Sequence, residues 1–227
     1  MNPIILKFDQ NLWDSLKDPS FKVYFDALIT KNEVMNLTNI TEENEVYQKH
    51  FYDSIILTKV FDLADKTLLD IGAGAGFPSI PIKLVEKKLK VVIVDALNKR
   101  IEFLRELIDK LAISDVGLLH ARAEEMDKTK LYDFVSARAV ARLNILTELA
   151  LPFVKLGGYF IAYKSINYHE ELSEAADAIS KIGGQLEKIV IYEINDSLKH
   201  VLLIIKKVKK TPSIYPRNFA KIKKSPL

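Results

Sequence analysis

The most constraining feature of this sequence is an alternation, from residue 66 onward, of short β-rich segments with longer segments of helical periodicity. Such alternation is typical of βαβ units, in which parallel strands form a sheet with helices on both faces. The β-rich segments are 67–71, 90–95, 116–120, 132–137, 159–163, 186–192 and 200–208. The pattern predicts an α/β fold with a doubly wound, mostly parallel, seven-stranded sheet.

The clearest helical segment between these strands is 98–112, where apolar residues form one stripe and Asn98 is the predicted N-cap. The last two β-rich segments are separated by Asn195-Asp196, which is a turn signal. We therefore expect a hairpin there, and the last strand should be antiparallel to its neighbours.

Residues 1–60 lack the alternation and contain two amphipathic helical segments, 21–31 and 42–61. We expect a helical N-terminal cap at 1–60, a Rossmann-like domain at 61–210 and a basic tail at 211–227.

A glycine-rich turn follows the first predicted strand. Three of the chain's eight glycines, Gly72, Gly74 and Gly76, lie within five positions, directly after Asp70 and before a helical segment at 80–85. Glycine permits positive φ angles and close approach of a ligand to the backbone. At the carboxyl end of a parallel strand, such a turn is a typical nucleotide-binding position. The alternative is a tight turn that binds no ligand.

The spacing of the glycines narrows the ligand class. The dinucleotide fingerprint would require glycine at position 77, where this chain has Phe77, and no Gly-Lys-Ser/Thr of a phosphate-binding loop follows. The second strand ends in Asp95, and an acid there can bind both hydroxyls of a ribose or can cap a helix. An adenosine ligand without phosphates, such as S-adenosylmethionine, fits this pattern. Its sulfonium would also favour nearby carboxylates such as Asp70.

Several motifs occur in an order that resembles the bacterial glucose-inhibited division protein B family. They are Asn36-Leu37-Thr38, His50 with Asp53-Ser54, the segment from Asp70 to Pro78, Asp95 with Lys99-Arg100 and Phe103-Leu104, the segment from Ala121 to Glu125, Arg138-Ala139, Tyr163-Lys164 and Tyr215-Pro216-Arg217. The resemblance covers the chain from about residue 30 to this last motif. It implies the class I methyltransferase fold and transfer of a methyl group from S-adenosylmethionine to N7 of one guanosine in 16S rRNA.

The resemblance also implies roles for single residues. Gly72 and Phe77 would line the methionine and ribose side of the cofactor, in a loop completed by Gly74 and Gly76, and Asp95 would meet the ribose. Ala123 and Glu124 would contact adenine. Arg138 is similar to an arginine that the family uses at cofactor and substrate. Two departures from the family pattern are Ser165 after Lys164 and a looser match at 220–227.

The implied chemistry needs no catalytic base, because N7 of guanine carries a lone pair and no proton. Catalysis would come from alignment and electrostatic stabilisation, with the target base splayed out of its stack. Candidate RNA-binding residues are Arg100, Arg138, Lys164 and Arg217, with Lys99 and Arg142 as further candidates. His50, Asp53 and Ser54 are spaced to share one helix face. The histidines show no metal-ligand spacing, and we expect no metal.

The charge distribution is uneven. Residues 206–227 carry eight basic side chains and no acidic one, whereas the first 205 residues carry 25 basic and 30 acidic side chains. A net charge of +3 thus combines a tail of +8 with a body of −5. Such a tail would neutralise RNA phosphates, with 16S rRNA or the small ribosomal subunit as partner, or would only aid solubility. We expect disorder only in about the last ten residues.

Composition excludes other classes. The chain has no cysteine, so it contains no disulfide, thiolate nucleophile or cysteine zinc site, as suits a reducing cytoplasm. We expect no signal peptide and no membrane span, and the family resemblance implies a monomer. Two alternatives stay open: a methyltransferase of the same fold with a non-RNA substrate, and a non-catalytic RNA-binding assembly factor.

Overall fold

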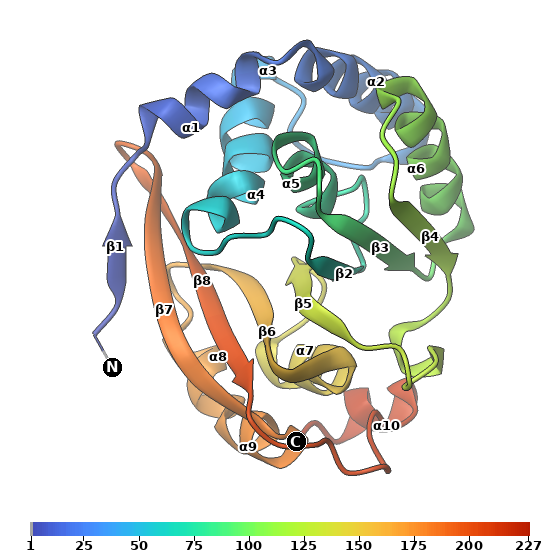
Figure 1. The fold of residues 1–227 in the computed structure, drawn as a ribbon, viewed down its shortest axis with the longest axis vertical. Coiled ribbons are helices and arrows are strands. Elements are labelled where there is room, and N and C mark those ends of the chain that lie inside the picture. Colours follow the sequence, from blue (N-terminus) through green and yellow to red (C-terminus); the bar gives the residue numbers. More distant parts are fainter. Residues whose placement is uncertain (1) are drawn as a thin grey trace.

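The computed structural model describes residues 2–227, which form a mixed eight-stranded sheet in the order β1-β7-β8-β6-β5-β2-β3-β4 (Figure 1). The strands are β1 (Ile4–Leu6), β2 (Thr67–Ile71), β3 (Lys90–Asp95), β4 (Val116–His120), β5 (Tyr132–Arg138), β6 (Val154–Ser165), β7 (Gly184–Asn195) and β8 (Leu198–Lys207). All seven predicted strands are present, three with the predicted bounds.

Strand β1 is the one that sequence reasoning missed. It has three residues and pairs in parallel with β7 at the edge of the sheet. Its Ile4 and Ile5 are 45% and 59% exposed. A short, exposed edge strand has no periodic hydrophobic signal, so the prediction that residues 1–60 contribute only helices is wrong at this segment.

The predicted hairpin is confirmed: β7 and β8 are antiparallel and are joined at Asn195. β8 is also antiparallel to β6, and it lies between β6 and β7. The other strand pairs are parallel, so the carboxyl ends of β2, β3, β4 and β5 lie along one edge.

The helices are α1 (Gln10–Asp14), α2 (Pro19–Met35), α3 (Glu43–Val46), α4 (Asp53–Ile55), α5 (Ser79–Val85), α6 (Asn98–Leu111), α7 (Leu143–Ala150), α8 (His169–Glu174), α9 (Ala176–Ile182) and α10 (Phe219–Lys224). In Figure 1, α1 to α6 lie on one side of the sheet and α7 to α10 on the other. Successive strand residues point to opposite faces, so Leu68 belongs to the core cluster under α2, α5 and α6, and Leu69 to the cluster under α7 and α9.

Two local helix predictions need correction. Helix α6 begins at Asn98 with Leu97 at its N-cap, so the prediction of Asn98 as the cap is wrong by one position. The segment 42–61 is not one continuous helix: a π-helical stretch (Tyr47–Tyr52) separates α3 from α4, and a 3₁₀ turn (Ile56–Lys59) follows. The hydroxyl of Ser54 donates to the carbonyl oxygen of His50 within this stretch, a side-chain bond that accompanies departures from regular helix geometry.

The C-terminal tail is folded against the body, so the expectation of disorder in the last ten residues is wrong. Helix α10 is capped by Asn218 and buries Ile222 completely in the core cluster that contains α7. Ahead of the helix, Arg217 forms an ion pair with the buried Glu148 of α7. Apolar residues spaced through a basic sequence thus dock the tail. Within residues 2–227, no helix is long and apolar enough to cross a membrane.

Candidate functional site

The glycine loop connects β2 to α5 at the carboxyl edge of the sheet. Gly72, Gly74 and Gly76 have φ angles of +68°, +60° and +103°, so all three use conformations that disfavour other residues. The amides of Gly76 and Phe77 both donate to the carbonyl oxygen of Ala73, which closes the turn.

The three glycines face different surroundings. A Cβ atom on Gly76 would lie 2.7 Å from the hydroxyl of Tyr24 and 2.9 Å from Ile80, and one on Gly72 would lie 2.8 Å from Val140. A Cβ atom on Gly74 would meet nothing within 4 Å. Gly72 and Gly76 therefore admit close packing within the protein, whereas Gly74 borders open space.

Asp95 fastens the loop to the end of β3. Its carboxylate is 3% exposed and accepts hydrogen bonds from the amides of Gly74 (3.2 Å) and Leu97 (2.9 Å) and from Arg100 (3.3 Å). A carboxylate offers about four lone-pair directions. Three donors leave one acceptor position, so the predicted ribose role stays compatible with this geometry.

A cavity of about 140 Å³ lies beside the loop, beyond the ends of β2, β3 and β4. It is lined by Ile71, Gly72, Val94, Asp95, Ala96, Ala121, Arg122, Ala123, Glu124, Val140, Leu149 and Phe219. The fold thus brings together four predicted cofactor residues: Gly72, Asp95, Ala123 and Glu124. Its volume is smaller than the usual 300–1,000 Å³ of small-molecule sites, because Val140 lies against Gly72 and Phe219 closes another side.

A larger cavity of about 490 Å³ lies between α8, α9 and β7. It is lined mainly by aliphatic side chains and contains none of the predicted site residues. The chemistry of the glycine loop, and not cavity size, identifies the site.

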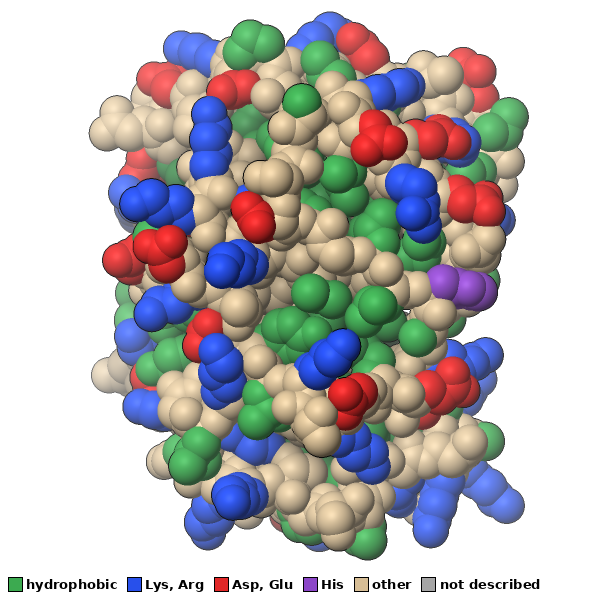
Figure 2. Space-filling view, turned by 45° about the vertical axis from the view of Figure 1, so that its right-hand side comes forward, with side chains coloured by type: hydrophobic (Ala, Val, Ile, Leu, Met, Phe, Trp, Pro, Cys, Tyr) green, Lys and Arg blue, Asp and Glu red, His purple; other side chains and the backbone are tan. Residues whose placement is uncertain are grey.

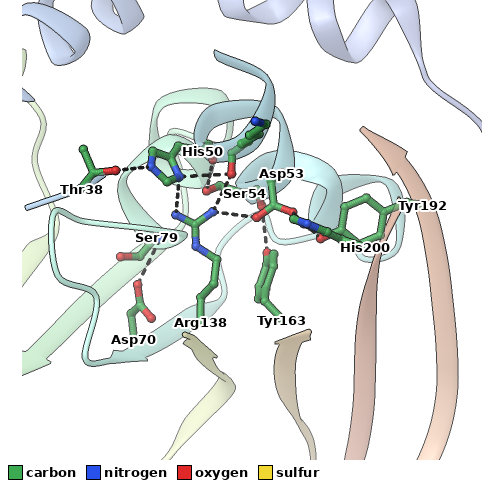
Figure 3. Close-up of polar contacts among 11 residues, drawn as sticks. Thr38, His50, Asp53, Ser54, Asp70, Ser79, Arg138, Tyr163, Tyr192 and His200 are labelled. Atoms are coloured by element: carbon green, nitrogen blue, oxygen red, sulfur yellow. Dashed lines mark hydrogen bonds and ion pairs between the residues drawn. The ribbon is translucent and has the colours of Figure 1, made fainter. Parts of the chain in front are cut away.

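The predicted cofactor residue Arg138 lies in a polar network between the N-terminal helices and the sheet (Figure 3), and Phe77 packs against it. Arg138, at the end of β5, donates to the carboxylate of Asp53 at 2.7 Å and faces Nδ1 of His50 at 3.3 Å. Its guanidinium lies 4.9 Å from the centroid of the Phe77 ring, which is buried against Tyr24. Phe77 therefore supports the loop from beneath.

Asp53 is the buried centre of this network, and Tyr192 and His200 donate to its second oxygen, each at 2.7 Å (Figure 3). Burial raises the pKa of Asp53, but the hydrogen bond from His200 and the charge of Arg138 outweigh it and lower that pKa overall. The carboxylate is therefore ionised and holds Arg138 in place. Tyr192 and His200 were not identified as site residues from the sequence, because only strand pairing brings β7 and β8 to α4.

Asp70 has a different place from the one that the sequence suggested. Its carboxylate is fully buried under the loop and accepts from the hydroxyl of Ser136 (3.0 Å) and the amide of Ser79 (3.2 Å). Burial raises the pKa of Asp70 to about 7. Asp70 was expected as a carboxylate near the sulfonium, but its buried side chain has a structural role: it ties the start of α5 to β2 and β5.

The predicted RNA-binding side chains are largely paired within the chain. Lys164 donates to Glu171 and to the carbonyl oxygen of Ala141, and Arg217 pairs with Glu148. Arg138 is held by Asp53, as described above. The exposed fractions of the side chains of Lys164, Arg138 and Arg217 are 11%, 14% and 15%, against 35% for Arg100. The further candidate Arg142 pairs with Glu174, whereas Lys99 is exposed.

Comparisons with known proteins show which family the sequence is similar to. The family model of rRNA small subunit methyltransferase G (GidB) matches residues 17–201. The chain is 49% identical over 214 residues to "Ribosomal RNA small subunit methyltransferase G" of Staphylococcus carnosus (strain TM300), covering 91% of this chain and 89% of the relative. It is 47% identical over 230 residues to the protein of that name from Lactococcus lactis subsp. lactis (strain IL1403), and the match covers 98% of this chain and 96% of the relative.

Solved structures of other methyltransferases share the fold. Ribosomal protein L11 methylase from Lactobacillus delbrueckii subsp. bulgaricus gives a TM-score of 0.55 at 17% identity, covering 71% of this chain and 80% of that chain. Precorrin-6y C5,15-methyltransferase from Geobacter metallireducens GS-15 gives a TM-score of 0.54 at 16% identity, and the match covers 74% of this chain and 90% of that chain. The predicted Rossmann-like methyltransferase fold is confirmed.

In His50→Gln, we expect the free energy of unfolding to fall less steeply than in the wild type as the pH is lowered. Burial, and then the charge of Arg138, lower the pKa of His50 to about 4 from an ordinary 6.5. The unfolded chain therefore binds a proton that the folded protein does not bind. Stability that is fully present above about pH 6.5 is lost as the pH falls through about 4, with a slope on the order of 1 kcal/mol per pH unit.

Urea denaturation between pH 7 and pH 4 measures this slope. The matched control is His169→Gln, at an exposed position, which should retain the wild-type slope. An unchanged slope in His50→Gln would contradict a neutral, buried imidazole in the network.

Proposed function

The chain belongs to the rRNA small subunit methyltransferase G family, and from this premise we propose that it transfers a methyl group from S-adenosylmethionine to N7 of one guanosine in 16S rRNA. The observation that carries the proposal is the glycine loop with its adjacent cavity, formed by residues within the matched region apart from Phe219. A methyltransferase that acts on small-subunit rRNA works where ribosomes are assembled, so we place it in the cytoplasm. From the family resemblance we also propose that it is a monomer.

The residues present fit an adenosine-containing cofactor. Gly74 borders open space at the loop, and Asp95 retains an acceptor position for a ribose hydroxyl. Ala123 and Glu124 follow β4 and line the cavity with apolar and polar surface. We propose that Gly72, Gly74, Asp95, Ala123 and Glu124 hold the cofactor.

Gly76, Phe77 and Arg138 would act less directly. Gly76 has no room for a side chain next to Tyr24, and Phe77 lies beneath the loop with Arg138 against its ring. We propose that these residues fix the shape of the loop on its cap side, with Arg138 oriented by Asp53 toward the edge where cofactor and substrate meet.

S-adenosylmethionine, when bound, supplies an electrophilic methyl group on a sulfonium. N7 of guanine has a lone pair and no proton, so the protein needs to align the base and to exclude water rather than to remove a proton. The segment 139–142 at the end of β5 is well placed to align the base, because Val140 covers Gly72 and is 40% exposed. Lys164 holds the segment through the carbonyl oxygen of Ala141. We propose that the target base is bound against this segment.

RNA binding would rest mainly on exposed basic side chains. Arg100 pairs with Asp95 but is the most exposed of the four predicted residues. Arg138, Lys164 and Arg217 are held by acidic partners and would contribute by keeping neighbouring segments in place. In the tail, the exposed basic residues are Lys209, Lys210, Lys221, Lys223 and Lys224. Basic side chains predominate at the lower end of the face in Figure 2, where Figure 1 places the C-terminal segment. We propose that this end binds RNA phosphates.

The function is tested by mapping N7-methylguanosine in 16S rRNA from cells with and without the gene. Without the gene, we expect one guanosine to lack its N7 methyl group. Borohydride and aniline should then no longer cleave the rRNA chain at this position. Purified protein with S-adenosylmethionine should restore both the methyl group and the cleavage. Full methylation in the absence of the gene would contradict the proposal, and methylation of a different atom would contradict the N7 assignment.

Gly74→Val should abolish cofactor binding while the protein stays folded. A branched side chain at Gly74 would enter the open space beside Asp95, where a Cβ atom meets no protein atom within 4 Å. It would therefore obstruct a ligand without a clash inside the protein. The strain of a non-glycine residue at positive φ costs about 1–2 kcal/mol. Calorimetric titration with S-adenosylhomocysteine measures binding, and circular dichroism measures folding.

The matched comparison is Gly76→Ala, whose methyl group would meet Tyr24 and Ile80. We expect Gly76→Ala to lose more stability than Gly74→Val, although its side chain is smaller. Wild-type affinity in folded Gly74→Val would contradict the cofactor assignment.

Replacing the five exposed tail lysines by Gln should weaken RNA binding most at low salt. Each phosphate contact contributes about 0.7–0.9 to the slope of log K against log salt, so the slope should fall by up to about 4. The control set is Lys17, Lys22, Lys66, Lys87 and Lys88, which are exposed and belong to the N-terminal helical region or to the turns that precede β2 and β3. An equal fall of the slope in both variants would remove the tail from the RNA interface.

A further inference from the structure

The C-terminal tail contributes an aromatic ring to the cavity beside the glycine loop. Phe219, the first residue of α10, lines this cavity together with Gly72, Asp95 and Ala123. The guanidinium carbon of Arg122, on the same cavity, lies 5.8 Å from the centre of the Phe219 ring. An aromatic ring therefore lies where β3 and β4 end, on the side of the site that the glycine loop does not cover.

A buried anchor fixes the position of this ring. The carboxylate of Glu148 is 1% exposed and accepts three hydrogen bonds from Arg217: from its amide (2.9 Å), Nε (2.8 Å) and Nη2 (2.6 Å). On the other side of Phe219, Ile222 is completely buried against α7 and its neighbours. The ring is thus held between a bidentate ion pair and an apolar contact.

Phe219 itself is only partly buried, unlike Ile222. A ring that served only to pack the tail would be expected in the core, whereas this one is shared between the core cluster and the cavity wall. The other apolar side chains of the wall are aliphatic and offer no planar surface: Ile71, Val94, Ala96, Ala121, Ala123, Val140 and Leu149. Phe219 is the lining residue that presents an aromatic face.

We propose that Phe219 is a cofactor-binding residue, which covers the adenine ring at the end of β4, so that the C-terminal tail is part of the cofactor site. This inference rests on the proposed function, because it assigns adenine to this cavity. Planar bases bind aromatic rings by stacking, and loss of one such contact costs on the order of tenfold in affinity. Arg122 against the ring adds a cation–π contact that holds it in orientation.

The test compares two ligands on full-length variants by calorimetric titration: S-adenosylhomocysteine and 5′-methylthioadenosine, which shares the adenosine but lacks the amino-acid end. Phe219→Ala should weaken both by about the same factor, near tenfold, because both carry adenine. Phe219→Tyr should retain wild-type affinity for both ligands. The affinities of Phe219→Leu should lie between those of Phe219→Tyr and Phe219→Ala. The control Ile214→Ala, at a tail residue that is 68% exposed, should change neither affinity.

Steady-state kinetics add a readout that loss of tail packing would not reproduce. In Phe219→Ala, KM for S-adenosylmethionine should rise, while kcat and KM for RNA stay at wild-type values. Affinities in Phe219→Ala within twofold of wild type would overturn the inference, and so would a loss confined to S-adenosylhomocysteine. If wild-type protein bound neither ligand, the proposed function itself would fail, and the two failures are therefore distinguishable.

Discussion

The buried carboxylate of Asp53 is the interaction on which the arrangement of this molecule depends. It belongs to α4 in the N-terminal region, yet its partners are Arg138 at the end of β5, Tyr192 on β7 and His200 on β8. Breaking a buried ion pair costs about 3–5 kcal/mol, because the remaining charge is left without compensation. The network therefore fixes the N-terminal helices on the sheet edge that also carries the glycine loop, and it places the Phe77 ring between the two.

Sequence reasoning predicted the fold well where the signal is local and periodic. β2, β3 and β4 are β-rich segments of five or six residues bounded by turns, and the structure has them at the predicted positions. The clustering of some candidate residues could also be predicted: Gly72 follows β2, Asp95 ends β3, and Ala123 and Glu124 follow β4, and parallel strands bring these ends together. By contrast, β1 pairs with a segment more than 180 residues away and has no periodicity of its own.

Charge patterns were the least informative signal. The sequence alone does not distinguish a basic side chain that is free for a phosphate from one that is held by a buried acid. Lys207 shows this: its ammonium group donates to the carbonyl oxygens of Leu151 and Ile182, and burial lowers its pKa to about 8. Lys206 pairs with Glu187 and Arg217 with Glu148. Five of the eight tail charges remain exposed, so the electrostatic attraction of the tail for RNA is smaller than its composition indicates.

The two sides of α10 connect the proposed RNA-binding and cofactor-binding surfaces. Phe219 and Ile222 are three positions apart and face the body, whereas Lys221, Lys223 and Lys224 are exposed. These lysines belong to the proposed RNA-binding surface, while docking of the helix keeps the Phe219 ring at the cavity. The ion pair between Arg217 and Glu148, together with the buried Ile222, holds the helix in this position. One six-residue helix therefore presents basic groups to the solvent on one side and an aromatic ring to the proposed cofactor cavity on the other.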